Sequence, residues 1–371
     1  MQDICRSVRI SVLASVGAGN ILPAHQIAGA LSARFPLAAA GLPGRAFSAG
    51  DILLIMGRGR WARHEFVQCL RAAGARGVKR VLWQLEPLPP PVEGLPKRIL
   101  QADLRNLSSL SRPESVLSRA RRSVVASALA RAFAISLRDS PQVDPSVRSM
   151  RKLLSYPLKQ VRDVAQLWRD GLLDHILVSV PPRKVLLAQH GIPSQVVPVG
   201  YLPELGSIIP GIERDVDVLF LGQISERRRD LLHAIRSHLR RHKRTIHVVD
   251  RDCYGEERNR LLNRSKIILN LQKFPWEFPV IRLLMAMGCK TLVVSERASD
   301  PGPFLEGRHA IVRDASELGE ALVTYLERNE ERSRIVDEAH RFVTESFTLA
   351  SLLSNALAPI AYASAVEVRN G

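Results

Sequence analysis

The chain has 371 residues, and 46% of them are hydrophobic, which fits a globular protein with two hydrophobic cores. Aromatic residues make up only 5%, which argues against an aromatic platform for stacking single-stranded bases. The net charge is +17, and of the 53 basic residues nine are Lys and the rest Arg. This arginine excess reflects either genomic base composition or the binding of phosphorylated ligands, whose oxygens suit guanidinium groups. The positive net charge is the only feature that suggests a nucleic-acid partner, so we do not expect one.

The cysteines and the N-terminal sequence indicate the expected cellular location of the protein. Cys5, Cys69, Cys253 and Cys289 lie far apart without metal-ligand spacing, so we expect reduced thiols and no metal site. The N-terminus lacks a basic region followed by an apolar core, and no uninterrupted run of about 18 apolar residues occurs. These features predict a cytoplasmic protein with neither a signal peptide nor a membrane span.

The chain opens with a pattern of strand, glycine turn and helix. Residues 8–15 form a short apolar run rich in β-branched side chains, Gly17 and Gly19 follow, and a helical pattern covers residues 22–35. This order is typical of nucleotide-binding α/β domains, although the third glycine of the dinucleotide fingerprint is missing. Gly17 and Gly19 therefore mark either a ligand-binding loop on the acceptor side or a tight turn before a helix.

A carboxylate follows the third predicted strand. Strands are predicted at residues 51–56 and 78–84, with a helix at 61–73 between them. Glu86 stands directly after the second of these strands, ahead of a proline-rich loop. It is either a catalytic base at a strand's carboxyl end or a surface carboxylate before a turn.

Residues 100–170 are rich in Arg and Ser and carry apolar residues at near-helical intervals. The pattern predicts a helical insertion with at least one basic amphipathic helix. Its positive face is either solvated or placed on an anionic membrane surface.

The domain boundary is predicted near residue 202. After a strand at 174–180, a helix at 183–189 and a strand at 195–199, residues 203–214 are rich in Pro and Gly without a clear period. The α/β pattern then restarts. We therefore expect an α/β protein with two facing doubly wound, Rossmann-like domains, at residues 1–202 and 215–347, and a C-terminal helix at 348–371 that returns to the first domain.

The second domain contains an arginine-rich turn. A strand at 216–221 is followed by Gly222 and by Arg227, Arg228 and Arg229 near the start of a helix predicted from residue 230. Gly222 allows close approach of a ligand, and a helix N-terminus with guanidinium groups suits a diphosphate. Arg227 is the preferred phosphate contact, and the alternative is a set of arginines that cap a solvent-facing turn.

A strand–helix–strand unit follows at residues 267–271, 280–287 and 291–295. Its first loop carries Glu277, which can accept two hydrogen bonds from sugar hydroxyls, and its helix carries Arg282. Arg282 either binds phosphate or forms a structural ion pair with Glu277. Tyr254 and Asn270 complete the candidate ligand-binding set of this domain. No Ser-His-Asp set, P-loop or Gly-x-Ser-x-Gly motif supports another enzyme class.

The runs VDVLFLGQISERRRDLL, SKIILNL and WEFPVIRLLMAMGCKTLVVSE make residues 215–347 recognisable. In their order they resemble the nucleotide-binding half of group 1 glycosyltransferases of GT-B fold, in particular the bacterial subset related to the spore-maturation type. The resemblance implies sugar transfer from a nucleotide-sugar donor to a glycan, lipid or protein acceptor, without a metal or other cofactor.

The resemblance also assigns roles to residues. Gly222 is kept, Gln223 stands where the family usually has Arg, and Arg227 can take the role of the family's Lys. A second Glu eight residues after Glu277 is missing, which leaves a catalytically inactive sugar- or nucleotide-binding protein as the alternative. An inverting enzyme needs a base from the first domain, for which His25 and Glu86 are the candidates. Peripheral contact with an anionic membrane at the inner face is a further expectation.

Overall fold

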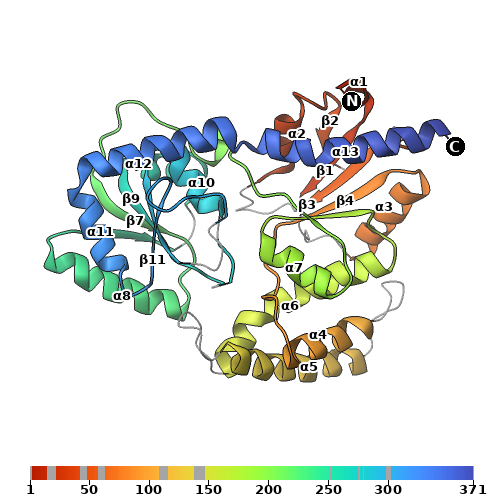
Figure 1. Ribbon diagram of the computed structural model, residues 1–371, viewed down its shortest axis with the longest axis horizontal. Helices are drawn as coiled ribbons and strands as arrows, with labels where there is room; N and C mark the ends of the chain where they lie inside the picture. The colour runs from red at the N-terminus through yellow and green to blue at the C-terminus, as the bar shows by residue number, and fades with distance from the viewer. Residues whose placement is uncertain are drawn as a thin grey trace. The chain divides into compact units, whose positions relative to one another are not determined.

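The computed structural model describes residues 2–14, 22–41, 48–56, 63–107, 116–137, 147–250, 253–274, 276–278, 280–297 and 302–370. The chain divides into two compact units. The first consists of Met1–Pro198 together with Leu353–Gly371, and the second of Val199–Leu352. Each unit holds a parallel β-sheet with helices packed on it (Figure 1).

The described part of the first unit contains a parallel sheet of six strands in the order β2-β1-β3-β4-β5-β6. Strand β3 is buried at every residue, as expected of a central strand covered on both faces. The order reverses at β1, since β2 lies on one side of it and β3 on the other. The elements are α1 (Gln2–Ser7), β1 (Ile10–Ala14), α2 (Ala24–Leu31), β2 (Ala38–Ala40), β3 (Ile52–Met56), α3 (Arg63–Ala75), β4 (Lys79–Gln84), α4 (Leu95–Arg105), α5 (Val116–Ser136), α6 (Val147–Arg169), β5 (His175–Val178), α7 (Pro181–Gln189) and β6 (Gln195–Val196).

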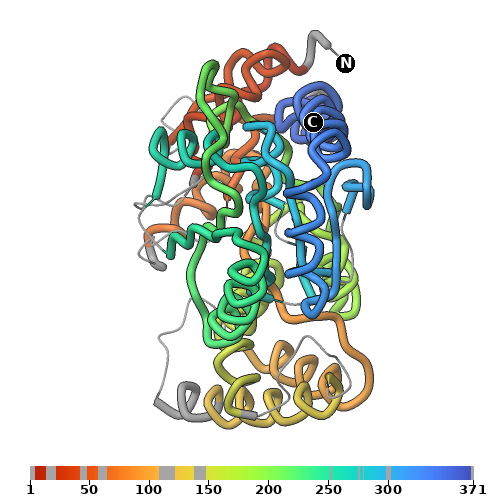
Figure 2. The backbone as a smooth tube through the Cα atoms, turned by 90° about the vertical axis from the view of Figure 1, so that its left-hand side faces the viewer, coloured from red at the N-terminus to blue at the C-terminus, as the bar shows by residue number. Residues whose placement is uncertain are grey.

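The basic segment of the first unit is helical, as predicted. Helices α4, α5 and α6 pack against one another and lie together in Figure 2. On α6 the apolar residues Met150, Leu154, Leu158 and Val161 are buried at helical spacing, while Lys152 and Lys159 are exposed. An amphipathic helix with a buried stripe and a basic outer face is therefore present.

The C-terminal helix α13 (Leu349–Asn370) contributes most of its length to the first unit. Its stretch Leu349–Val368 is long and apolar enough to cross a membrane by length and composition alone, although polar residues interrupt it. Half of that stretch is buried inside the protein, and a core helix passes the same test. Leu353, Leu357 and Ala361 are fully buried one turn apart, which marks the face that packs into the core.

In the second unit, five parallel strands follow the order β11-β10-β9-β7-β8 among the described residues. Alternate residues such as Val218 and Phe220 join one apolar cluster with α8 and α11, whereas Leu219 and Ile268 are buried on the opposite face. The elements are η1 (Pro203–Leu205), β7 (Val216–Leu221), α8 (Glu226–Arg241), β8 (Ile246–Val249), α9 (Gly255–Arg264), β9 (Ser265–Asn270), α10 (Val280–Gly288), β10 (Leu292–Glu296), β11 (Ile311–Arg313), α11 (Leu318–Glu327), α12 (Asn329–Arg341) and η2 (Phe342–Ser346).

The strand order of this sheet reverses at β7. The next strand in sequence, β8, lies on one side of β7, and the following strand, β9, lies on the other. Such a reversal separates the loops that leave two neighbouring strands and opens a crevice at their carboxyl ends. Both units show this arrangement, so the predicted α/β class with two doubly wound domains is confirmed.

Candidate functional site

The reversal point of the second unit is framed by the segments that follow β7 and β9. Gly222 begins the turn after β7, and Leu271 follows the last residue of β9, Asn270. Ser225 caps helix α8 by accepting a hydrogen bond from the Arg228 backbone N–H at 3.3 Å. The helix therefore starts at Glu226, four residues before the predicted start, and its N-terminus lies at the same edge of the sheet as the two strand ends.

Gly222 makes room for an arginine. Its φ is +135°, in the region that favours glycine, and a Cβ at this position would lie 2.6 Å from Nη2 of Arg282. The sequence suggested that Gly222 lets a ligand approach the backbone. The group that approaches it in the structure is the guanidinium of Arg282.

Two guanidinium groups meet at this point. Arg228 donates from Nη1 to the Gln223 carbonyl at 2.8 Å and from Nη2 to the Leu271 carbonyl at 2.6 Å, so it bridges the segments after β7 and β9. Arg282 donates from Nη1 to Oδ1 of Asn270 at 2.5 Å. Both groups lie over the Phe220 ring, at 5.8 and 5.6 Å from its centroid. The aromatic face and the carbonyls thus hold two like charges side by side.

The surroundings of the two arginines disfavour their charged forms. Burial, and then the neighbouring charge of Arg228, lowers the pKa of Arg282 to about 9. Burial lowers the pKa of Arg228 to about 10, although the charge of Glu296 opposes the shift. Arg228 is 3% exposed, and its Nε has no hydrogen-bond partner among the described residues. An anion beside the two guanidinium groups would offset their positive charge.

Arg227, the preferred phosphate contact from the sequence, lies in an ion pair with Glu296. Its Nη1 donates to Oε2 of Glu296 at 3.0 Å, and its Nη2 donates to Oε1. Glu296 is the last residue of β10 and is fully buried, and it also accepts the backbone N–H of Gln272 at 2.9 Å. Arg227 therefore neutralises a buried carboxylate beside the arginine pair.

The structure brings together three of the predicted donor-site residues. Asn270 is buried at the end of β9 and joins Arg282 to β10, since its Nδ2 donates to Oγ of Ser295 at 3.0 Å. Gly222 contacts the same arginine. Glu277 is buried in the loop between β9 and α10, and Tyr254 precedes α9 with 49% of its surface exposed.

The candidates of the first unit lie on separate elements. His25 is exposed in the first turn of α2. Glu86 is partly buried after β4 and accepts a hydrogen bond from the Tyr156 hydroxyl of α6 at 2.7 Å. Gly17 and Gly19 lie outside the described residues. Their segment follows β1, where the strand order of this sheet reverses.

Sequence comparison finds one family model that matches part of the chain. Residues 226–358 match a family model described as glycosyl transferase-like. The match begins at the first residue of α8 and covers Arg227, Arg228, Glu277, Arg282 and Glu296. No curated protein is significantly similar to the chain in sequence.

A solved structure supports the fold of the chain. The crystal structure of TarM aligns with a TM-score of 0.50 and 9% identity over 84% of this chain and 54% of the TarM chain. The chain thus spans about half of the TarM chain, and the likeness supports the two-domain GT-B fold class. HepE from Anabaena, solved in complex with UDP-glucose, aligns with a TM-score of 0.49 and 12% identity over 96% of this chain and 99% of its own.

The sequence reasoning missed two residues of this site. Arg228 was grouped with its neighbours, although its place three residues after the helix cap Ser225 turns it inward. Glu296 was treated as the end of an apolar strand. A carboxylate at the carboxyl end of a buried strand was the available signal, because a buried charge needs a partner.

Proposed function

We propose that this protein transfers a sugar from a nucleotide-sugar donor to an acceptor hydroxyl, with the donor diphosphate held at the reversal point of the second unit. The observation that carries the proposal is the pair of Arg228, which is buried, and Arg282, which is partly buried: burial lowers the pKa of each, and Nε of Arg228 has no acceptor among the described residues. The glycosyl transferase-like sequence of residues 226–358 supports it.

In the proposed reaction the bond between the anomeric carbon and the diphosphate oxygen breaks, and a bond from the acceptor oxygen to the anomeric carbon forms. Negative charge develops on the leaving diphosphate, where two guanidinium groups and the N-terminus of α8 stabilise it. The positive charge of these groups takes the role that a metal ion would otherwise have, so we propose transfer without a metal cofactor. The acceptor's proton passes to a base, for which Glu86 and His25 are the candidates in the first unit.

We also propose contacts to the donor and a chemical class for the acceptor. Glu277, buried in the loop after β9, is the proposed partner of the ribose or sugar hydroxyls. Tyr254 is the proposed contact to the nucleobase of the donor. The acceptor is a glycan, lipid or protein hydroxyl. We further propose that the chain belongs to the bacterial subset related to spore-maturation glycosyltransferases, on the basis of its motif order.

A donor screen tests the proposed function. Common nucleotide-sugars are incubated with the full chain, and release of nucleoside diphosphate is measured for the wild type, Arg282→Lys and Arg229→Ala. Arg229 is exposed one residue after Arg228 and serves as the matched control. We expect release by the wild type and by Arg229→Ala, and a loss of at least about tenfold in Arg282→Lys, because Lys lacks the planar fork. Tight nucleotide binding without any release would instead identify a sugar- or nucleotide-binding protein that has lost activity.

A cytoplasmic location at an anionic membrane is the proposed setting. Helix α5 exposes Val124 and Ile135 at 69% and 72% of their surface, with the exposed Arg131 between them. Apolar side chains beside basic ones suit the interface of an anionic bilayer. Co-sedimentation with vesicles containing phosphatidylserine, and none with phosphatidylcholine vesicles, is the expected result, and Val124→Asp with Ile135→Asp should abolish it.

A further inference from the structure

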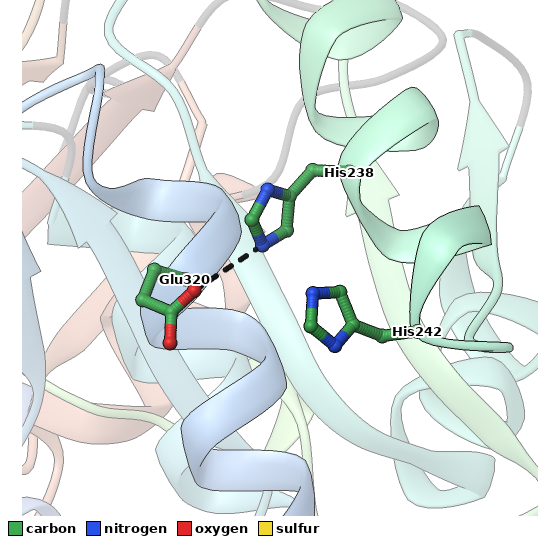
Figure 3. Close-up of side chains that lie close together, drawn as sticks. All are labelled: His238, His242 and Glu320. Atoms are coloured by element: carbon green, nitrogen blue, oxygen red, sulfur yellow. Dashed lines mark ion pairs between the residues drawn. The ribbon is translucent and has the colours of Figure 1, made fainter.

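Three potential metal ligands meet on the second unit, away from the arginine pair. His238 and His242 stand four residues apart at the C-terminal end of α8, and Glu320 lies on α11 (Figure 3). One ligand atom from each residue lies within 4.8 Å of the other two. Nε2 of His238 is 3.4 Å from Oε2 of Glu320, and the two imidazole rings stack with centroids 5.0 Å apart.

The packing of α11 holds His238 in place. Gly319 precedes Glu320, and a Cβ at Gly319 would lie 2.9 Å from Cγ of His238. A glycine inside a helix costs about 1 kcal/mol relative to alanine, so this position weakens α11 by itself. Its effect is to let the His238 ring lie against the α11 backbone, with Nε2 directed at the carboxylate of the next residue.

We propose that His238, His242 and Glu320 bind a divalent transition-metal ion, zinc in the first instance, that fastens α8 to α11. Two imidazoles and one carboxylate are a recognised zinc ligand set, with water in the fourth position. Zinc bonds of about 2.0–2.2 Å place neighbouring ligand atoms roughly 3.4 Å apart in a tetrahedron, the separation between His238 and Glu320.

Small side-chain movements complete the site. His242 and Glu320 are exposed, so their side chains can turn toward His238, whose side chain is only 25% exposed. Arg241 reaches Nδ1 of His238 at 3.4 Å, a long contact from an exposed side chain that can give way to water. The carboxyl end of α8 also favours a cation, because the last carbonyls of a helix carry partial negative charge.

The site is separate from the proposed donor site. His238 stands ten residues after Arg228 on the same helix, which places the two about 15 Å apart along its axis. The ion therefore acts as a structural link between α8 and α11. Its binding and the binding of a nucleotide can be measured independently on the same protein.

Zinc titration of the untagged, EDTA-treated full chain tests the proposal. Calorimetry should show one zinc ion per chain, and saturating zinc should raise the melting temperature by about 5 °C or more. His242→Ala and Glu320→Gln should each weaken zinc binding by at least about tenfold and leave nucleotide binding unchanged. His233→Ala is the matched control, since His233 is an exposed histidine on the same helix, and it should bind zinc as the wild type does.

Two results would overturn the proposal. One is the absence of zinc binding by the wild-type chain. The other is zinc binding that His242→Ala and Glu320→Gln leave unchanged, which would place the ion elsewhere and reduce the cluster to a contact between helices. The two exposed ligands are tested because their substitution leaves the packing of His238 on Gly319 intact.

Discussion

Replacing Arg227 by Ala tests whether this residue holds Glu296 or holds a ligand. Glu296 is fully buried, whereas the side chain of Arg227 is 30% exposed. Removing one partner of a buried ion pair costs about 3–5 kcal/mol, and the partial exposure of Arg227 argues for the lower end, about 3 kcal/mol. The second unit spans Val199–Leu352, a size at which each kcal/mol shifts the melting temperature by about 2–4 °C. We therefore expect a fall of about 6–12 °C.

Differential scanning calorimetry of the full chain measures this loss. Glu296→Gln should cost less, about 1 kcal/mol, because Arg227 can then turn toward water. In the double variant the two losses should not add, since the partners are coupled. Arg229→Ala, the exposed neighbour, should stay within about 0.5 kcal/mol of the wild type. A melting temperature of Arg227→Ala equal to that of the wild type, together with lost nucleotide affinity, would refute this reasoning and make Arg227 the phosphate contact.

Two further predictions concern a turn and an ion pair. Gly222→Ala should destabilise the chain by about 1–3 kcal/mol and weaken nucleotide binding, because the new methyl group displaces Arg282. The control is Gly211→Ala, at a glycine with φ of +78° and open space around it. In the same thermal-unfolding measurements it should show only the cost of the strained backbone. Burial raises the pKa of Asp174, but hydrogen bonds and charge from Arg80 outweigh it and hold that pKa below 3.8. The stability from this pair is thus present above pH 3.8 and lost as the pH falls through the lower folded-state value, so Asp174→Asn should flatten the acid limb of the unfolding curve, and an unchanged limb would contradict the assignment.

The buried strands could be predicted from the sequence because their apolar runs are continuous. Strand β7 was predicted at residues 216–221 and is found there, and α10 differs by one residue. Strand β2 was missed, since Ala38–Ala40 carries no β-branched or large apolar side chain. The start of α8 was placed four residues late because the capping role of Ser225 was overlooked.

The candidate site was predictable in position but less so in its contacts. Strand ends and a glycine turn place Gly222, Asn270 and Arg282 at one edge of the sheet, and the structure joins them. Which of three successive arginines turns inward depends on helix phase and on partners distant in sequence. The ion pair of Arg227 with Glu296 spans 69 residues, so no local pattern reveals it.

Titration of a nucleoside diphosphate into the wild-type chain, Arg228→Lys and Arg229→Ala tests the central claim most directly. If Arg228 and Arg282 bind the diphosphate, Arg228→Lys should bind it about tenfold to a hundredfold more weakly, which is the scale of a lost hydrogen bond to a charged group. Arg229→Ala should bind as the wild type does. Equal affinity in all three proteins would contradict the account, because the diphosphate would then lie away from the reversal point of the second sheet.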